Sequence, residues 1–259
     1  MKTYFTLITG ASKGFGKAMA LELAKRGMNL VLIALPNSGL KELSGFIENN
    51  YSVAVFFLEK DLSKIPSYYE IYDFIENNNI NIKYLINNAG ILSRGLFEDL
   101  DNQFIIDQIE VNAMAPTVLI KLLLPNLKQN APAGILNISS MAGFFALPKK
   151  QVYGGTKAYL VSFSNSIRKE LKKDHISVTT ICPGGLNTTT KLCYQNRILG
   201  FMARESTLTP ELAAKISIDA MLAGKKQVVP GFINKFFMVL DKLLPEFIQD
   251  KLTNGEIKN

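Results

Sequence analysis

Short apolar runs alternate with stretches of helical length along most of this chain, and this alternation limits the folds open to it. The apolar runs are rich in β-branched and aromatic residues and cover Tyr4 to Thr9, Leu30 to Leu35, Val53 to Leu58, Tyr84 to Ile86, Ile135 to Ile138, Val178 to Ile181 and Gln227 to Val229. Helical patterns begin near Gly16, Gly39, Ser67, Asn102, Tyr153 and Pro210. Strands that are apolar throughout are buried on both faces, and an intervening helix joins parallel strands by a right-handed crossover. We therefore predict an α/β fold with one doubly wound parallel sheet and helices on both faces.

Composition narrows the class of protein further. The chain has 259 residues, of which 47% are hydrophobic, enough for one domain with a sizeable core. Its net charge of +7 comes from dispersed basic pairs such as Lys172-Lys173 and Lys225-Lys226, so we expect no nucleic-acid partner. The apolar stretch from 118 to 127 is interrupted by Lys121 and Pro125 and is too short to span a membrane. The 2 cysteines show no metal-ligand spacing, which predicts no bound metal and a reducing, cytoplasmic location.

A glycine-rich turn follows the first predicted strand directly. The segment Thr9-Gly10-Ala11-Ser12-Lys13-Gly14-Phe15-Gly16 leads into a helical stretch. Glycines permit a tight turn, and free N–H groups at a helix N-terminus attract a pyrophosphate. The spacing Gly-x-x-x-Gly-x-Gly departs from the commoner dinucleotide fingerprint, and a purely structural turn is the alternative interpretation. The strand–turn–helix context favours a dinucleotide site.

Tyr153 and Lys157 lie four residues apart in a predicted helix, so their side chains share one face. An ammonium about 4 Å from a phenol, at an effective dielectric near 20, favours the phenolate by roughly 4 kcal/mol, or about three pKa units. The tyrosine could then exchange protons near neutral pH. The pair alone is weak evidence, because this spacing also arises by chance on exposed helices.

These motifs together resemble the short-chain dehydrogenase/reductase family over about residues 3 to 230. The family's motifs appear in order as Thr9 to Gly16, Asn87-Asn88-Ala89-Gly90, Val111-Asn112-Ala113, Asn137-Ile138-Ser139-Ser140, Tyr153 with Lys157, and Pro183-Gly184-Gly185-Leu186-Asn187-Thr188. The resemblance implies a Rossmann-like catalytic and dinucleotide-binding domain over residues 1–231. It also implies an NAD(P)(H)-dependent oxidoreductase that interconverts a carbonyl and a secondary alcohol.

The resemblance assigns a role to each matching residue. Tyr153 would be the general acid that protonates the carbonyl, and Lys157 would lower its pKa and bind the nicotinamide ribose. Ser140, and not its neighbour Ser139, would polarise the carbonyl. Asn112 would hold a water that connects Lys157 to solvent. The implied cofactor-binding residues are Gly10, Ser12, Lys13, Gly14, Phe15, Gly16, Asp61, Leu62, Asn88, Ala89, Gly90, Tyr153, Lys157, Pro183, Gly184 and Thr188.

Charge near the second strand bears on the choice of cofactor. An NAD site usually has a carboxylate at the end of this strand, which would repel the 2′-phosphate of NADP. The segment Leu32 to Ser38 contains no carboxylate, and Lys13 resembles the basic residue of NADP-dependent members. Leu35 stands where those members usually have an arginine. We predict NADP, with NAD as the alternative. Asp61 matches the family's adenine contact, although it could simply be a carboxylate at a helix N-terminus.

The segment that closes over the substrate in the family corresponds to Leu186 to Leu208, which is apolar in large part. Phe144, Phe145 and Leu147 would line the same cavity or serve as plain packing. We predict reduction of a hydrophobic ketone, such as a steroid-like compound, a keto-lipid or a xenobiotic; a small polar ketone is the competing substrate class. The alternative function is a catalytically silent nucleotide-binding regulator or scaffold.

The family pattern fades beyond Gly231, and residues 232–259 form a predicted C-terminal amphipathic extension. Its apolar side, from Phe232 to Ile248, suits packing on the domain or on a second subunit, or peripheral contact with a membrane. The resemblance further implies a homodimer or a homotetramer.

Overall fold

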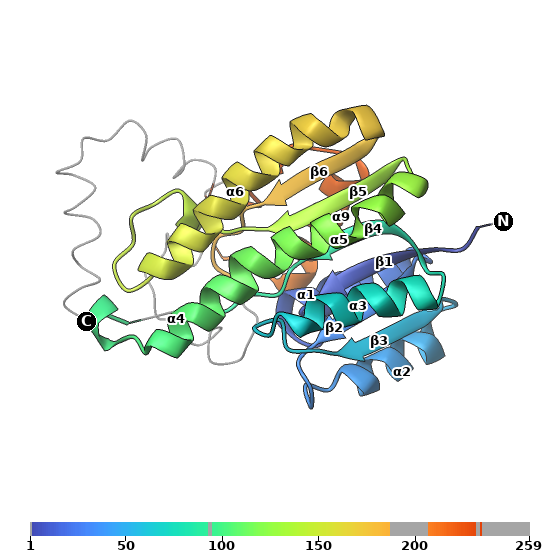
Figure 1. Cartoon of the computed structure of the whole chain (residues 1–259), viewed down its shortest axis with the longest axis horizontal. Helices are drawn as coiled ribbons and strands as arrows, with labels where there is room; N and C mark the ends of the chain where they lie inside the picture. The colour runs from blue at the N-terminus through green and yellow to red at the C-terminus, as the bar shows by residue number, and fades with distance from the viewer. Residues whose placement is uncertain (1, 93–94, 187–206, 232–233, 235–259) are drawn as a thin grey trace.

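The chain folds around one parallel sheet, seen in the computed structural model, which describes residues 2–92, 95–186, 207–231 and 234 (Figure 1). The strand order is β3-β2-β1-β4-β5-β6-β7, and every pair of neighbours is parallel. The strands are β1 (Tyr4–Thr9), β2 (Asn29–Ala34), β3 (Val55–Glu59), β4 (Asn81–Asn87), β5 (Ala133–Ile138), β6 (Ile176–Ile181) and β7 (Gln227–Val228). This order confirms the predicted doubly wound α/β fold.

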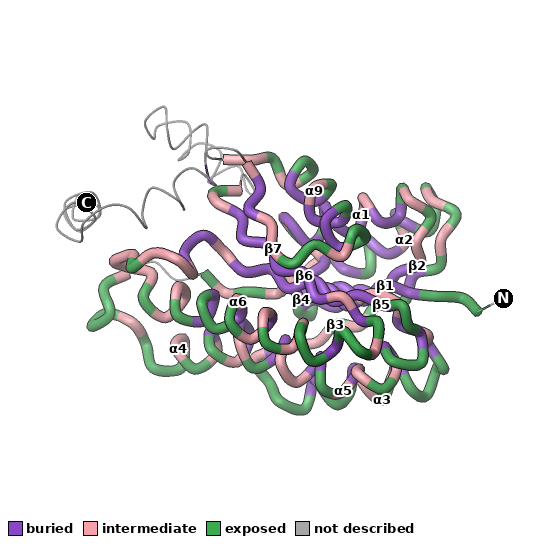
Figure 2. Tube along the Cα trace, turned by 90° about the horizontal axis from the view of Figure 1, so that it is seen from above, coloured by how far each residue is buried: buried purple, intermediate pink, exposed green. Residues whose placement is uncertain are grey.

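Helices cover both faces of the sheet (Figure 2). One layer holds α1 (Gly14–Lys25), α2 (Leu40–Asn50) and α9 (Pro210–Leu222). The other holds α3 (Pro66–Asn77), α4 (Asn102–Ile109), α5 (Ala115–Gln129) and α6 (Gln151–Leu171). Short helical turns are η1 (Phe97–Asp99), η2 (Glu110–Met114), η3 (Met141–Gly143) and η4 (Lys172–Asp174).

Alternate residues of each central strand enter opposite cores, which is why these strands are apolar throughout. In β1, Leu7 packs in the core under α3 and α5, whereas Ile8 packs in the core under α1 and α9. In β2, Leu32 and Ile33 divide in the same way, and these four side chains are fully buried. Because successive side chains of a strand point to opposite faces, each of these strands contributes to both hydrophobic layers.

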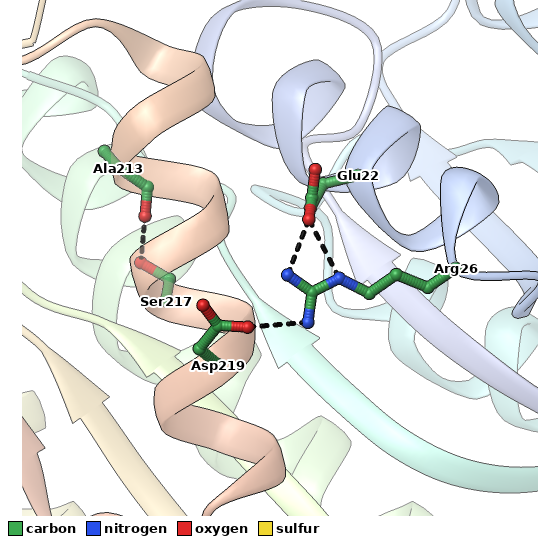
Figure 3. Close-up of polar contacts among 5 residues, drawn as sticks. All are labelled: Glu22, Arg26, Ala213, Ser217 and Asp219. Atoms are coloured by element: carbon green, nitrogen blue, oxygen red, sulfur yellow. Dashed lines mark hydrogen bonds and ion pairs between the residues drawn. The ribbon is translucent and has the colours of Figure 1, made fainter.

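Arg26 ties the first helix of the fold to α9, which is distant in sequence (Figure 3). Its Nε and Nη2 donate to Glu22 Oε1 at 2.8 and 2.6 Å, and its Nη1 donates to Asp219 Oδ1 at 2.7 Å. One planar guanidinium thus bridges carboxylates on two helices of the same layer.

The predicted helix near Asn102 is one part of a longer path that includes α4, the π-helical turn η2 and α5. Pro125 lies inside α5, although proline supplies no N–H to a helix. Among the described residues, no helix is both long enough and apolar enough to cross a membrane. The predicted C-terminal extension lies outside the described residues apart from Asn234, whose Nδ2 donates to Pro230 O at 2.8 Å.

Candidate active site

The glycine-rich turn joins β1 to α1 at the carboxyl end of β1. In the sheet, β1 is next to β4, and the strand order reverses at this point, where α/β sheets form their ligand crevices. Asn88 holds the turn: its Nδ2 donates to Thr9 O at 2.9 Å and to Gly10 O at 3.1 Å. Thr9 Oγ1 accepts the Asn88 and Ala89 N–H groups at 3.0 and 3.1 Å. A Cβ on Gly16 would lie 2.0 Å from Gly10 O, so only glycine permits this close approach.

The N-terminus of α1 fits a pyrophosphate. No side chain caps it, and its first turn contains no acidic residue. Its free N–H groups and partial positive charge are therefore open to an anion. Lys13 is exposed beside this terminus, and Ser12 and Gly14 are half-buried. The side chain of Phe15 is buried in the core, so only its backbone could contact a cofactor.

Tyr153 and Lys157 lie on α6 near the carboxyl end of β5. Lys157 Nζ lies 5.6 Å from the centroid of the Tyr153 ring and donates to Ile138 O at 2.9 Å. Lys157 is buried, and the loss of hydration lowers its pKa to about 8. The ammonium is thus held by a backbone carbonyl between the strand end and the phenol.

Ser140 and Ser139 point to different partners, as expected for adjacent extended residues. Ser140 Oγ accepts the Ala142 N–H at 3.1 Å and caps η3, and its hydroxyl also hydrogen-bonds Tyr153. Ser139 Oγ is buried and donates to Lys157 O at 2.8 Å. Ser140 is therefore the serine that faces the phenol.

The pKa of Tyr153 corrects one expectation from the sequence. Burial raises this pKa above its ordinary value, and the hydrogen bond with Ser140 acts in the opposite direction. Spacing alone overstated the electrostatic effect, because it could not include the cost of burying a phenolate.

Asn112 is buried in the π-helical turn η2 and is tied to the backbone of Ile91. The Ile91 N–H donates to Asn112 Oδ1 at 2.7 Å, and Asn112 Nδ2 donates to Ile91 O at 2.9 Å. A Cβ on Gly90 would lie 3.3 Å from Asn112 Oδ1 and 3.4 Å from Lys157 Nζ. The Asn112 amide and the Lys157 ammonium therefore both lie next to the space that a side chain at position 90 would occupy, and glycine leaves this space free.

At the predicted adenosine end, Asp61 Oδ1 accepts the Ser63 N–H at 2.9 Å, and the side chain of Leu62 is buried.

The loop after β2 contains a feature that the sequence prediction missed. Glu59, at the end of β3, accepts the Asn37 N–H at 3.1 Å through its Oε1. A carboxylate therefore does lie beside this loop, supplied by the neighbouring strand through the Ala34–Glu59 pairing. The exposed side chain of Leu35 stands close by in sequence.

The predicted Pro-Gly turn lies beside the Ser140 segment, because Met141 N–H donates to Pro183 O at 2.9 Å. A Cβ on Gly184 would lie 2.6 Å from Asn234 Oδ1. Phe144 and Phe145, predicted to line a substrate cavity, are half-buried against Met141, Cys182 and Val229. Thr188 and most of the predicted substrate-covering segment lie outside the described residues.

Comparison with known proteins identifies the class. Residues 5–195 match the family described as short chain dehydrogenase, and the chain belongs to this family of oxidoreductases. It is 31% identical to the very-long-chain 3-oxoacyl-CoA reductase-B of Danio rerio over 97% of this chain and 79% of that protein.

Two solved structures are also similar. The bulky-bulky ketone specific alcohol dehydrogenase of Comamonas testosteroni has 26% identity and a TM-score of 0.78, covering 92% of this chain and 91% of that one. A short-chain dehydrogenase of Sphingobium yanoikuyae, in complex with NADPH, has 25% identity and a TM-score of 0.80, covering 92% of each chain. These findings support a nicotinamide cofactor and carbonyl–alcohol interconversion.

Proposed function

We propose that the protein reduces a hydrophobic ketone to a secondary alcohol, with NADPH as the preferred cofactor and Tyr153 as the general acid. The observation that carries this proposal is the meeting of Tyr153, Ser140, Lys157 and Asn112 at the carboxyl edge of β5, beside the α1 N-terminus. A silent nucleotide-binding scaffold would not need a buried lysine held against a phenol, since that arrangement costs stability.

The chain's own residues would perform the following steps. The N–H groups of Gly14 to Gly16 would bind the pyrophosphate, and Lys157 would hold the ribose. A nicotinamide cofactor bound in this way would supply the hydride that the carbonyl carbon accepts. Ser140 would donate a hydrogen bond to the carbonyl oxygen, and Tyr153 would transfer its phenolic proton to that oxygen. A water held near Asn112 would return a proton through Lys157.

A raised pKa of Tyr153 is compatible with this direction of reaction. A general acid must carry its proton at the working pH, and burial keeps the phenol protonated. The phenol can still give up this proton, because the alkoxide that develops on the substrate is a strong base and accepts it. We expect reduction to be the favoured direction near neutral pH.

NADPH preference rests on Lys13, which is exposed next to the pyrophosphate-binding turn, and on the lack of a carboxylate within the segment from Leu32 to Ser38. Glu59 opposes this preference from β3. The substrate class is suggested by two similar proteins. By their names, the Danio rerio reductase acts on a very-long-chain 3-oxoacyl-CoA, and the Comamonas testosteroni dehydrogenase acts on bulky ketones. Both are ketones with large substituents, so a long or bulky ketone is the proposed substrate here.

A homo-oligomer in the cytoplasm completes the proposal. Apolar side chains are exposed on neighbouring elements of one layer, namely Ile106 and Ile109 of α4, Met114 of η2 and Tyr159 of α6. Exposed apolar surface of this kind suits contact with a second copy of the chain.

Replacement of Tyr153 by phenylalanine tests the function. Tyr153→Phe removes the transferable proton but keeps the ring, so we expect NADPH oxidation with a panel of steroids, keto-acyl thioesters and diketones to fall at least about a thousandfold. NADPH binding, followed by its fluorescence, should change little. Tyr69→Phe, an exposed tyrosine on α3, is the matched control and should keep full activity. A wild-type protein that binds NADPH but oxidises none across the panel would instead favour the scaffold.

A further inference from the structure

A pocket lies at the edge of the sheet opposite Tyr153. It has a volume of about 490 Å³ and is formed where α6 ends and where β5, β6 and β7 begin. Figure 1 shows this end of α6 beside the tails of the β5 and β6 arrows, whereas the start of α6, the part of the helix that contains Tyr153, lies on the side of the arrowheads. A ligand bound here would therefore be separate from the reacting ketone and its cofactor.

The pocket is strongly basic. Its lining includes Arg168, Lys169, Lys172, His175 and Lys226, and it includes no aspartate or glutamate. Within the part of the chain that the structure describes, none of these basic side chains forms an ion pair. The acidic residue next to His175, Asp174, is paired with Lys128 at 3.0 Å and so is already neutralised.

Arg168 provides a fixed charge within the pocket. Its Nη1 donates to Val178 O at 2.6 Å and its Nη2 donates to Gly224 O at 2.8 Å, so the guanidinium is held between β6 and the segment before β7. Lys169, Lys172 and Lys226 are exposed around it, and their flexible stems can turn toward a ligand. Asn165 and Ser177 add neutral polar groups to the lining.

Compensation of the α6 dipole does not explain the whole cluster. Arg168 and Lys169 lie in the last turn of α6, where cations are favourable. Lys226 comes from another segment, the one before β7, which has no such need. Like charges gathered in one concavity repel each other and destabilise the folded chain, so a bound anion would offset a standing cost.

We propose that this pocket binds a phosphate-bearing ligand. A guanidinium matches phosphate geometry, lysines add point charges, and the volume lies within the range of small-molecule sites. The phosphate could belong to a soluble phosphorylated compound or to the headgroup of an anionic lipid, and the two sources are separated by experiment.

The test uses the full chain saturated with NADPH, so that the pyrophosphate-binding turn is already filled. Inorganic tripolyphosphate is titrated while the melting temperature is followed. We expect it to stabilise the wild type, and the triple variant Lys169→Gln, Lys172→Gln, Lys226→Gln to bind it about tenfold or more weakly. The matched control changes three exposed lysines elsewhere, Lys41→Gln, Lys121→Gln and Lys215→Gln, and should bind like the wild type. NADPH binding should be equal in all three proteins.

Vesicles of phosphatidylcholine with and without phosphatidic acid form the second arm. Cosedimentation that needs phosphatidic acid and is lost in the triple variant would assign the site to a lipid phosphate. Binding of tripolyphosphate without cosedimentation would assign it to a soluble ligand. Equal binding of tripolyphosphate by the triple and control variants, or no binding by the wild type in either arm, overturns the proposal. The triple variant should also melt no lower than the wild type in the absence of anions, which excludes misfolding as the cause of lost binding.

Discussion

At the scale of single residues, Lys157 shows a conflict between stability and activity. Its pKa is lowered to about 8 by burial, from an ordinary value of 10.5, so the folded state holds the ammonium less well than the unfolded chain does. The shift corresponds to roughly 3 kcal/mol of lost stability near neutral pH as an upper bound. The proposed reaction gives a reason to retain such a residue.

We predict that Lys157→Met stabilises the cofactor-free protein by about 2 kcal/mol near pH 7, because it removes a buried charge. The gain is smaller than the full penalty, since the Ile138 carbonyl loses its hydrogen-bond donor. Below pH 8 the lysine is charged in both states and its penalty is complete. Between about pH 8 and the unfolded value of 10.5, the unfolded chain binds more protons, so wild-type stability rises with pH. The gap between the two proteins should therefore narrow over this range in urea denaturation. A gap that is constant with pH would contradict the assignment.

Glu59 provides a second prediction at this scale. Its carboxylate lies beside the loop after β2, where it would repel a 2′-phosphate. Glu59→Gln should raise the ratio of kcat/KM for NADPH over NADH by roughly fivefold, and Lys13→Gln should lower it by a similar factor. Glu48→Gln, an exposed carboxylate on α2, is the control. An unchanged ratio in the Glu59 variant would show that this carboxylate does not face the cofactor.

The catalytic candidates could be located from sequence, but their electrostatics could not. The positions of Tyr153, Ser140 and Asn112 follow from motif spacing, because each motif fixes the end of one strand or one turn of a helix. The upward shift of the Tyr153 pKa and the approach of Glu59 to Asn37 depend on burial and on strand register, which involve residues far apart in sequence. These are tertiary effects that no local pattern contains.

At the scale of elements, α1 and α9 pack in one layer although nearly 200 residues separate them, and Arg26 joins them. We predict that Arg26→Ala lowers the free energy of unfolding by about 1 kcal/mol, because it leaves Glu22 and Asp219 without their partner. The loss should shrink in high salt, which screens the half-exposed pair with Asp219. Lys25→Ala, one residue earlier and exposed, should change stability by only a few tenths of a kcal/mol. Equal effects of the two variants would contradict a specific role for the bridge.

The strand and helix pattern was predictable at this scale because each central strand serves two apolar cores. The helical path from α4 to α5 was less predictable. Asn112 exchanges hydrogen bonds with the Ile91 backbone in the middle of a π-helical turn, and Pro125 sits within α5. Local propensity favours a break at such residues, whereas burial of Leu119, Leu123 and Leu127 in the core maintains the helix.

At the scale of the whole molecule, charged and apolar surfaces lie in different places. The basic pocket occupies the edge where β5 to β7 begin, whereas the apolar side chains of the proposed contact between copies lie on α4, η2 and α6. Two copies of the chain that meet there would each carry a net charge of +7, so their mutual repulsion would oppose association at low salt. An anion bound in the basic pocket would lower this charge and weaken the repulsion, so ligand binding and association should be coupled.

We predict that the wild type sediments as a dimer or a tetramer, and that Ile106→Glu with Ile109→Glu yields the 28.7 kDa monomer. Two carboxylates in a desolvated apolar contact cost several kcal/mol, which exceeds what a modest interface can offset. The control is Phe46→Glu on α2, in the opposite helical layer, where the side chain is equally exposed but lies away from the proposed contact. Sedimentation velocity distinguishes the species. A wild-type monomer across the accessible concentration range, or a double variant that still associates, would show that the α4 and α6 face is not the contact. Equal loss of association in the Phe46 variant would place the contact on the α2 layer instead.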